Sequence, residues 1–165
     1  MTTHLQRGFI ILLLLSINAC GFQLRGSNLE NLDNANIFIQ AAAGSNLALE
    51  LKRQLSFAGV NITDSAGHAD YVIHLSDESY DKDVLSVSSE TGKVAEYQLI
   101  TSSRLSITGT DDKHLVDDET ISARRDYIFD QDSVLGKFDE EQKIREEINQ
   151  QLAASIIRRL RAVTR

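Results

Sequence analysis

The feature that most constrains this chain is one cysteine, Cys20, which directly follows a short apolar run. Residues 9–17 read Phe-Ile-Ile-Leu-Leu-Leu-Leu-Ser-Ile, Arg7 precedes them, and the first acidic residue is Glu30. A basic start, a short apolar stretch and a small residue at the cut are typical of a secretory signal peptide. The run is about half of the roughly 20 apolar residues that a membrane-spanning helix needs. The sequence therefore predicts that residues 1–19 are a signal peptide that is removed on export.

Cys20 is the only cysteine of the chain, so it cannot form an internal disulfide. An exported protein with one unpaired thiol needs an explanation. The segment Ile17-Asn18-Ala19-Cys20 resembles the bacterial lipobox, whose cysteine is diacylated and then acylated on its new amino terminus. Each buried acyl CH₂ contributes about 0.8 kcal/mol, so three chains would anchor the protein permanently. We therefore predict lipidation of Cys20; the alternative is an ordinary buried cysteine.

The rest of the chain has the length and charge of one acidic domain. Removal of residues 1–19, which carry one arginine, leaves 16 Lys+Arg against 24 Asp+Glu, a charge of about −8. Such a chain is a poor candidate for nucleic-acid binding. Without disulfides, the hydrophobic core must supply the stability. We expect a lipidated tether over residues 20–35 and a single domain over residues 36–165.

The hydrophobic pattern predicts an α+β fold with two helices packed on one face of a four-stranded mixed sheet. Strands are expected at residues 36–41, 71–75, 94–108 and 114–130, and residues 84–87 either continue the second strand or form a separate piece. Helices are expected near residues 47–58 and 138–163, and the first two strands should be parallel because a helix connects them. The expected buried stripes are Leu47, Leu51 and Leu55 in the first helix, Ile144, Ile148, Leu152, Ile156 and Leu160 in the last, and Tyr97, Leu99, Leu105, Ile107, Ile121, Ala123, Tyr127 and Phe129 in the strands.

No constellation of catalytic or metal-ligating residues can be read from the chain. It contains neither a phosphate-binding glycine loop nor a Gly-x-Ser-x-Gly nucleophile elbow. His68, His74 and His114 have no partner at metal-ligand spacing, and Asp117-Asp118 lacks the alternation of a calcium loop. The sequence therefore predicts a protein that is not an enzyme, with no catalytic residue, cofactor or metal.

Three segments together resemble one family. The stretch Cys20-Gly21-Phe22-Gln23-Leu24-Arg25 is similar to the mature start of the LPS-assembly lipoprotein LptE family. A second match is Ala95-Glu96-Tyr97-Gln98-Leu99, and the helix that leads to Gly59-Val60 is the third. The family fold, two helices against a four-stranded sheet, agrees with the pattern above.

The resemblance implies an outer-membrane lipoprotein of Gram-negative bacteria that carries palmitate on Cys20. Members of the family plug the LptD β-barrel one-to-one, assist its folding, and take part in lipopolysaccharide transport to the outer leaflet. The chain is then expected at the periplasmic side of the outer membrane and inside the barrel lumen. The resemblance also implies lipopolysaccharide contacts at Lys93, in the turn between two strands, and at Lys137, near the start of the last helix.

Two other readings stay open from the residues alone. A lipoprotein that carries lipid by itself needs a large apolar cavity, usually under a curved sheet rich in aromatic residues, and aromatic residues are only 6% of this chain. A lipid-anchored hydrolase needs a catalytic constellation that the sequence does not display. Both are therefore ranked below the plug.

Overall fold

The computed structural model describes Leu32, residues 34–129 and residues 137–164. In chain order the elements are β1 (Asn36–Gln40), α2 (Asn46–Phe57), β2 (Asn61–Ile62), η3 (Ala66–His68), β3 (Tyr71–Val87), β4 (Val94–Thr108), η4 (Thr110–Asp112), β5 (His114–Ile128) and α3 (Lys137–Val163). Cys20 and the expected signal peptide lie outside the described residues. None of the helices within the described ranges is both long and apolar enough to cross a bilayer.

The strands form one mixed sheet in the order β2-β1-β3-β4-β5. β1 is parallel to both β2 and β3, whereas β3, β4 and β5 are antiparallel to one another. The α+β class and the parallel first crossover are thus confirmed. The expected number of four strands is wrong, because Asn61–Ile62 pairs with the start of β1 as a fifth strand. A two-residue strand contains no alternation, so the sequence pattern gave no signal for it.

Local sequence explains where α2 begins and ends. The Ser45 hydroxyl accepts a hydrogen bond from the Ala48 amide at 2.9 Å, which caps one of the free N–H groups of the first turn. After the helix, Gly59 has φ +82°, a conformation that glycine adopts without steric cost. Leu47, Leu51 and Leu55 recur on one face and are fully buried, as expected.

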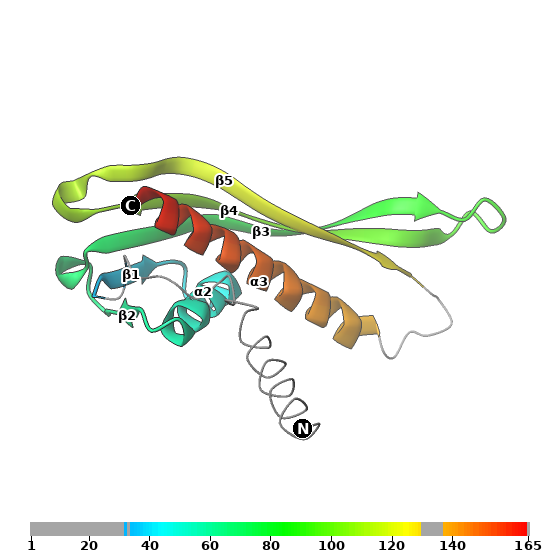
Figure 1. Cartoon of the computed structure of the whole chain (residues 1–165). Helices are drawn as coiled ribbons and strands as arrows, with labels where there is room; N and C mark the ends of the chain where they lie inside the picture. Colours follow the sequence, from blue (N-terminus) through cyan, green and yellow to red (C-terminus); the bar gives the residue numbers. More distant parts are fainter. Residues whose placement is uncertain (1–31, 33, 130–136, 165) are drawn as a thin grey trace, which may run out of the picture.

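Both helices lie on the same face of the sheet (Figure 1). The stripe of α3 faces the sheet in the expected phase: four of its five expected residues are buried and Ile144 is partly buried. On β4, which lies between β3 and β5, Leu99, Leu105 and Ile107 are fully buried in the same layer. Leu32 is fully buried as well, so the core begins before β1. Arg159 fastens α3 to β5 through two hydrogen bonds of 2.9 and 2.7 Å to the Glu119 carboxylate.

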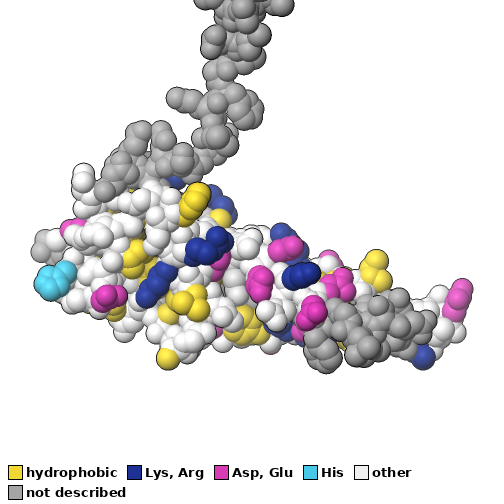
Figure 2. Space-filling model, turned by 90° about the horizontal axis from the view of Figure 1, so that it is seen from below, with side chains coloured by type: hydrophobic (Ala, Val, Ile, Leu, Met, Phe, Trp, Pro, Cys, Tyr) yellow, Lys and Arg dark blue, Asp and Glu magenta, His cyan; other side chains and the backbone are white. Residues whose placement is uncertain are grey.

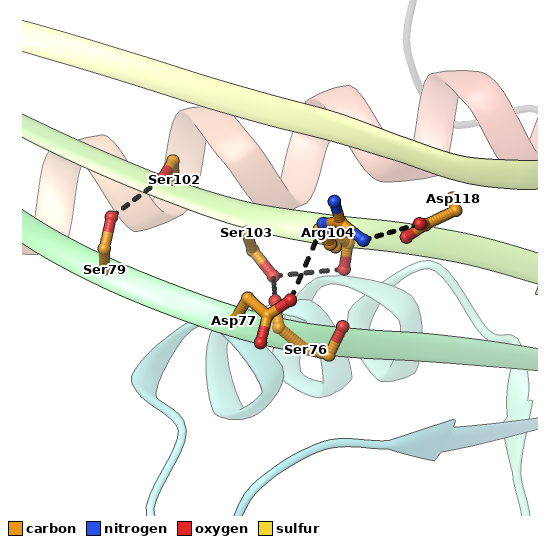
Figure 3. Close-up of polar contacts among 7 residues, drawn as sticks. All are labelled: Ser76, Asp77, Ser79, Ser102, Ser103, Arg104 and Asp118. Atoms are coloured by element: carbon orange, nitrogen blue, oxygen red, sulfur yellow. Dashed lines mark hydrogen bonds and ion pairs between the residues drawn. The ribbon is translucent and has the colours of Figure 1, made fainter.

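Two irregularities interrupt the sheet on either side of Arg104 (Figure 3). The register shifts between Ser76 and Ser79 of β3, and again where β4 pairs with β5 near residues 116–119. Asp77 and Asp118 take φ values of +49° and +40° there, and Arg104 reaches both carboxylates, at 3.6 and 2.7 Å. Bulges bend a strand and increase its twist. We therefore expect β3 and β5 to bend and twist on either side of Arg104.

Candidate functional site

Beyond these bulges, β3 and the first part of β4 continue as a long ribbon that we call the distal hairpin, residues 79–98. Figure 1 shows its tip projecting past both helices. Tyr80, Val84, Leu85 and Val87 are exposed along its β3 side, with exposed fractions from 41% to 60%. A group of exposed apolar side chains on one element is more informative than isolated ones, because such groups mark interaction surfaces.

Lys93 lies in the turn at the tip of this hairpin and is exposed. The turn is closed by a 2.8 Å hydrogen bond from the Ser88 amide to the Lys93 carbonyl. Gly92 has the positive φ, +67°, that the turn requires, a conformation that glycine adopts without steric cost. The lysine side chain is therefore carried on the turn at the far end of the distal hairpin, away from the core of the described residues (Figure 1).

The base of the hairpin is joined to the start of α3 through one carboxylate, Glu141. It accepts hydrogen bonds from Lys82 Nζ at 2.7 Å, from Arg145 Nη2 at 2.9 Å and from the Tyr127 hydroxyl at 3.2 Å. These four residues are named the Glu141 cluster below. Lys82 also lies 4.4 Å from the centre of the Tyr97 ring, a cation–π distance. The cluster therefore holds β3, β5 and α3 together where the hydrophobic core ends.

The electrostatics of the cluster follow from partial burial and close pairing. Burial raises the pKa of the Glu141 carboxyl, but the hydrogen bonds from Lys82 and Arg145 outweigh it, and the net pKa is lowered. Burial lowers the pKa of Lys82, yet its bond to Glu141 leaves the net pKa raised. Tyr80 lies beside the cluster, with its ring centre 5.9 Å from the Arg145 guanidinium, and burial together with the nearby Glu78 carboxylate raises the pKa of Tyr80 to about 12. All of these groups therefore keep one charge state at neutral pH.

The structure places the expected lipopolysaccharide contacts on two different elements. Lys93 is at the hairpin tip, and Lys137 is the first residue of α3. The position of the Lys137 side chain lies outside the described residues, as does Cys20. Sequence reasoning did not find the Glu141 cluster. Its members are far apart along the chain, and neither helical nor strand periodicity signals such a contact.

The three histidines of the described residues lie on different elements. His68, His74 and His114 lie on η3, β3 and β5. Within residues 34–129 and 137–164, no group of three or more His, Cys, Asp or Glu side chains is arranged to hold a metal ion. Asp118 pairs with Arg104 and Glu119 with Arg159, so both carboxylates have structural partners.

The face of the sheet opposite the helices is polar along its centre. Six alternate residues of β4 point to that face. One of them, Ile100, is apolar, and the other five are hydrophilic: Gln98, Ser102, Arg104, Ser106 and Thr108. Neighbouring strands add Ser79, whose hydroxyl lies 2.8 Å from that of Ser102. No described helix covers this face (Figure 1). The domain therefore presents a broad hydrogen-bonding surface on the side of the sheet that faces away from the helices and the hydrophobic core.

These features define a class: an α+β domain with two helices on one side of a mixed sheet and an uncovered polar face on the other. The chain belongs to the LptE lipopolysaccharide-assembly family, whose model matches residues 28–160. The family predicted from the three short segments is thus confirmed. No curated protein matches the chain.

Solved structures of named lipoproteins share this fold. The rare lipoprotein B of Shewanella oneidensis is 25% identical, with a TM-score of 0.66 over 77% of this chain and 94% of that one. A lipoprotein B of Nitrosomonas europaea is 23% identical, with a TM-score of 0.70 over 87% and 92%. A minor lipoprotein of Acinetobacter baumannii is 21% identical, with a TM-score of 0.62 over 78% and 91%.

Proposed function

We propose that this chain is an outer-membrane lipoprotein that plugs and helps to assemble the LptD β-barrel, and that it acts in lipopolysaccharide transport without being an enzyme. Family membership supports the role in lipopolysaccharide assembly. The observation that best supports a plug inside the barrel is the uncovered polar face of the sheet. The lumen of a large membrane barrel is polar and wet, so a domain that fits inside it needs a hydrophilic skin.

The same geometry favours a plug over a lipid carrier. A carrier needs space between its layers, whereas Leu99, Leu105 and Ile107 of β4 are fully buried under the helices. The interior polar residues Thr101 and Ser103 are also buried in this layer. The space between the sheet and the helices is filled by these side chains.

The test is co-purification of the tagged full chain from detergent-solubilised outer membrane. If the chain is a plug, one large barrel protein should co-purify with it in a one-to-one ratio. Replacing Ser102 and Ser106 by Trp should reduce that yield, because bulky apolar groups would disturb a polar contact surface. Replacing the exposed helix residues Lys143 and Glu147 by Ala is the matched control and should leave the yield unchanged. Recovery of the chain without any barrel protein would refute the plug.

Anchoring is tested separately at Cys20. Mass spectrometry of the mature protein should show an acylated amino-terminal cysteine and the loss of residues 1–19. Cys20→Ala should fold normally but leave the membrane fraction. An unmodified thiol at that position would refute the anchor without affecting the plug.

The contact with lipopolysaccharide is proposed for Lys93 and Lys137. A lysine can donate a charge-assisted hydrogen bond to a phosphate, about twice as strong as a neutral one. Changing both lysines to Glu should weaken binding to purified lipopolysaccharide, and the weakening should shrink in high salt because exposed charges are screened. Barrel co-purification should survive the double change. Unchanged lipopolysaccharide binding would exclude these two residues.

A further inference from the structure

The outward side of α2 carries the most exposed large apolar side chains of the described helix residues. Phe57, the last residue of α2, is 94% exposed, and Leu49 is 62% exposed. The inward stripe of the same helix, which includes Leu51 and Leu55, is fully buried. Phe57 therefore adds no buried apolar surface to the fold, and apolar side chains grouped on the outside of one short helix form a candidate contact surface.

α3 continues this surface past the end of α2. The Gln54 side chain donates a 3.1 Å hydrogen bond to the Gln150 carbonyl, so the two helices lie side by side at this point. Ala154, Ile157 and Arg161 follow Gln150 at intervals of three or four residues and share its side of the helix. All three are partly exposed. The exposed surface therefore runs from the end of α2 onto the second half of α3.

The charge of α3 changes sign along the helix. Residues 137–147 contain five acidic residues, whereas residues 148–164 contain none and include three arginines: Arg158, Arg159 and Arg161. Arg159 is paired with Glu119, and Arg158 is exposed without an ion-pair partner among the described residues. Figure 2, a view from the helix side, shows basic and apolar side chains together over the half of this layer farther from the distal hairpin. The layer therefore attracts anions locally, although the mature chain carries about −8.

The exposed side of α2 has the same character. Lys52 is exposed and has no ion-pair partner among the described residues. Arg53 is bonded to Glu50 but keeps 65% of its side chain exposed. Phe and Leu side chains close to Lys and Arg are typical of helices that lie in a membrane interface. Their apolar groups enter the boundary between headgroups and acyl chains, and their basic groups contact anionic headgroups.

The chain enters the domain in this same part of the molecule. Leu32, shortly before β1, is fully buried in the core that contains Leu47 and Leu55 of α2. Residues 20–31 separate it from the expected anchor at Cys20, and a fully extended chain spans at most about 3.6 Å per residue, so the anchor is held within roughly 45 Å of Leu32. The tip of the distal hairpin projects away from β1 and α2 (Figure 1). An anchored domain is therefore expected to meet the membrane with its α2 end.

We propose that the outward side of α2 and the second half of α3 form a membrane-contact face, which lies on anionic phospholipid headgroups. Phe57 and Leu49 enter the boundary between headgroups and acyl chains, while Lys52 and Arg158 contact lipid phosphates. The inference rests on the proposed function only for the anchor at Cys20, which brings the face within reach of the bilayer. The proposed plug uses the opposite, uncovered face of the sheet, so one domain can contact a barrel and a bilayer together.

The first test places one tryptophan in a chain that has none. The full mature chain with Cys20→Ala is held on phosphatidylglycerol-containing vesicles through an amino-terminal histidine tag and a nickel-chelating lipid, so the result does not depend on lipidation. The emission of Phe57→Trp should move to shorter wavelength and be quenched by lipids that are spin-labelled on the acyl chain. Val87→Trp, at an exposed apolar position of the distal hairpin, is the matched control and should keep the emission of a tryptophan in water.

The second test measures the contribution of charge without the tag, by sedimentation with the same vesicles. Lys52→Gln combined with Arg158→Gln should weaken binding about fivefold for each basic charge removed, and the weakening should shrink in high salt. Lys93→Gln combined with Arg124→Gln removes the same charge from exposed positions on the hairpin turn and β5, and should leave binding unchanged. Equal weakening by the two pairs would overturn the proposal, as would a parent chain that does not sediment with these vesicles at low salt.

The tryptophan test also separates a bilayer from a protein as the occupant of this face. Unchanged emission of Phe57→Trp on vesicles, or an equal change in Val87→Trp, would overturn the membrane contact. A response of Phe57→Trp to the purified barrel protein in detergent, but not to vesicles, would assign the face to the barrel and equally overturn it. The vesicle measurements contain neither barrel nor lipopolysaccharide, so their failure leaves the plug standing. Failure to co-purify a barrel would refute the plug without changing the vesicle result.

Discussion

The two ends of β3 show how differently one strand is used in two regions of this molecule. Between Tyr71 and Leu75 it lies under the helices, and Ile73 is fully buried. Past the bulge at Asp77 it has no β1 beside it, and Val84 and Val87 are more than half exposed. Burial of apolar surface is the main stabilising term in folding. The helix-covered body therefore holds most of the stability, while the distal hairpin keeps its apolar side chains available for a partner.

The largest expected contrast comes from truncating one apolar side chain in each region. Leu152→Ala should cost about 2–5 kcal/mol of unfolding free energy, because Leu152 is 1% exposed and its removal leaves a cavity. Val84→Ala should stay within about 0.5 kcal/mol, as is usual for surface positions. Urea unfolding measures both. Equal losses would mean that the hairpin is as much a part of the core as α3.

The Glu141 cluster is the link between the two regions, and its loss should have the next largest effect. Glu141→Gln should cost about 1–3 kcal/mol at pH 7, since it weakens hydrogen bonds to charged donors. The exposed neighbour Glu140 provides the control, and Glu140→Gln should have little effect. Urea unfolding again measures the difference.

The pH dependence gives this prediction a second readout. The pKa of Glu141 is lowered in the folded state, so its contribution is complete above the ordinary value of 4.5 and is lost as pH falls through the folded pKa. The stability difference between the parent chain and Glu141→Gln should therefore shrink between neutral and acidic pH. A difference that stays constant down to strongly acidic pH would contradict the charge-based role.

The body was largely predictable from sequence because its signals are local and periodic. Leu51, Leu55, Ile148 and Ile156 recur at helical spacing, and each is fully buried. Strand alternation likewise identified Leu105 and its neighbours on β4. Pattern reasoning was incomplete at Thr101 and Ser103, which are hydrophilic yet buried on the same face. The structure accounts for the buried Ser103 hydroxyl, because it donates to the Ser76 carbonyl beside the bulge, at 2.9 Å.

The bulges, the Glu141 cluster and the membrane-contact face could not be derived in the same way. Each depends on side chains from elements that are distant in sequence, such as Lys82 and Glu141, whose proximity follows only from the folded topology. One weak signal was available for the bulges. Asp77 and Asp118 each stand beside a second acidic residue within a strand, and aspartate tolerates positive φ better than most residues.

Two glycines allow the same backbone change to be made in each region. Gly59 ends α2 in the body and Gly92 forms the hairpin turn, with φ values of +82° and +67°, and a Cβ at either would meet no atom within 4 Å. Replacing either glycine by alanine should therefore lower the free energy of unfolding only through backbone strain, by about 1–2 kcal/mol. We expect Gly59→Ala to lower global stability, and Gly92→Ala to accelerate amide exchange mainly in the hairpin. Uniform destabilisation by both changes would show that the two regions unfold as one unit.

The smallest effect is expected at Arg104, at the boundary between the regions. Its ion pairs with Asp77 and Asp118, at 3.6 and 2.7 Å, are exposed, with half or more of each side chain accessible to solvent. Exposed pairs contribute about 0–1 kcal/mol, and salt screens them, so Arg104→Gln should cost little at low salt and less at about 1 M. Arg124→Gln, an exposed change on β5, is the control. A loss above about 2 kcal/mol that persists in high salt would show that Arg104 holds the bend itself. The hairpin would then depend on this one side chain rather than on the packing of β4 and β5 against α3.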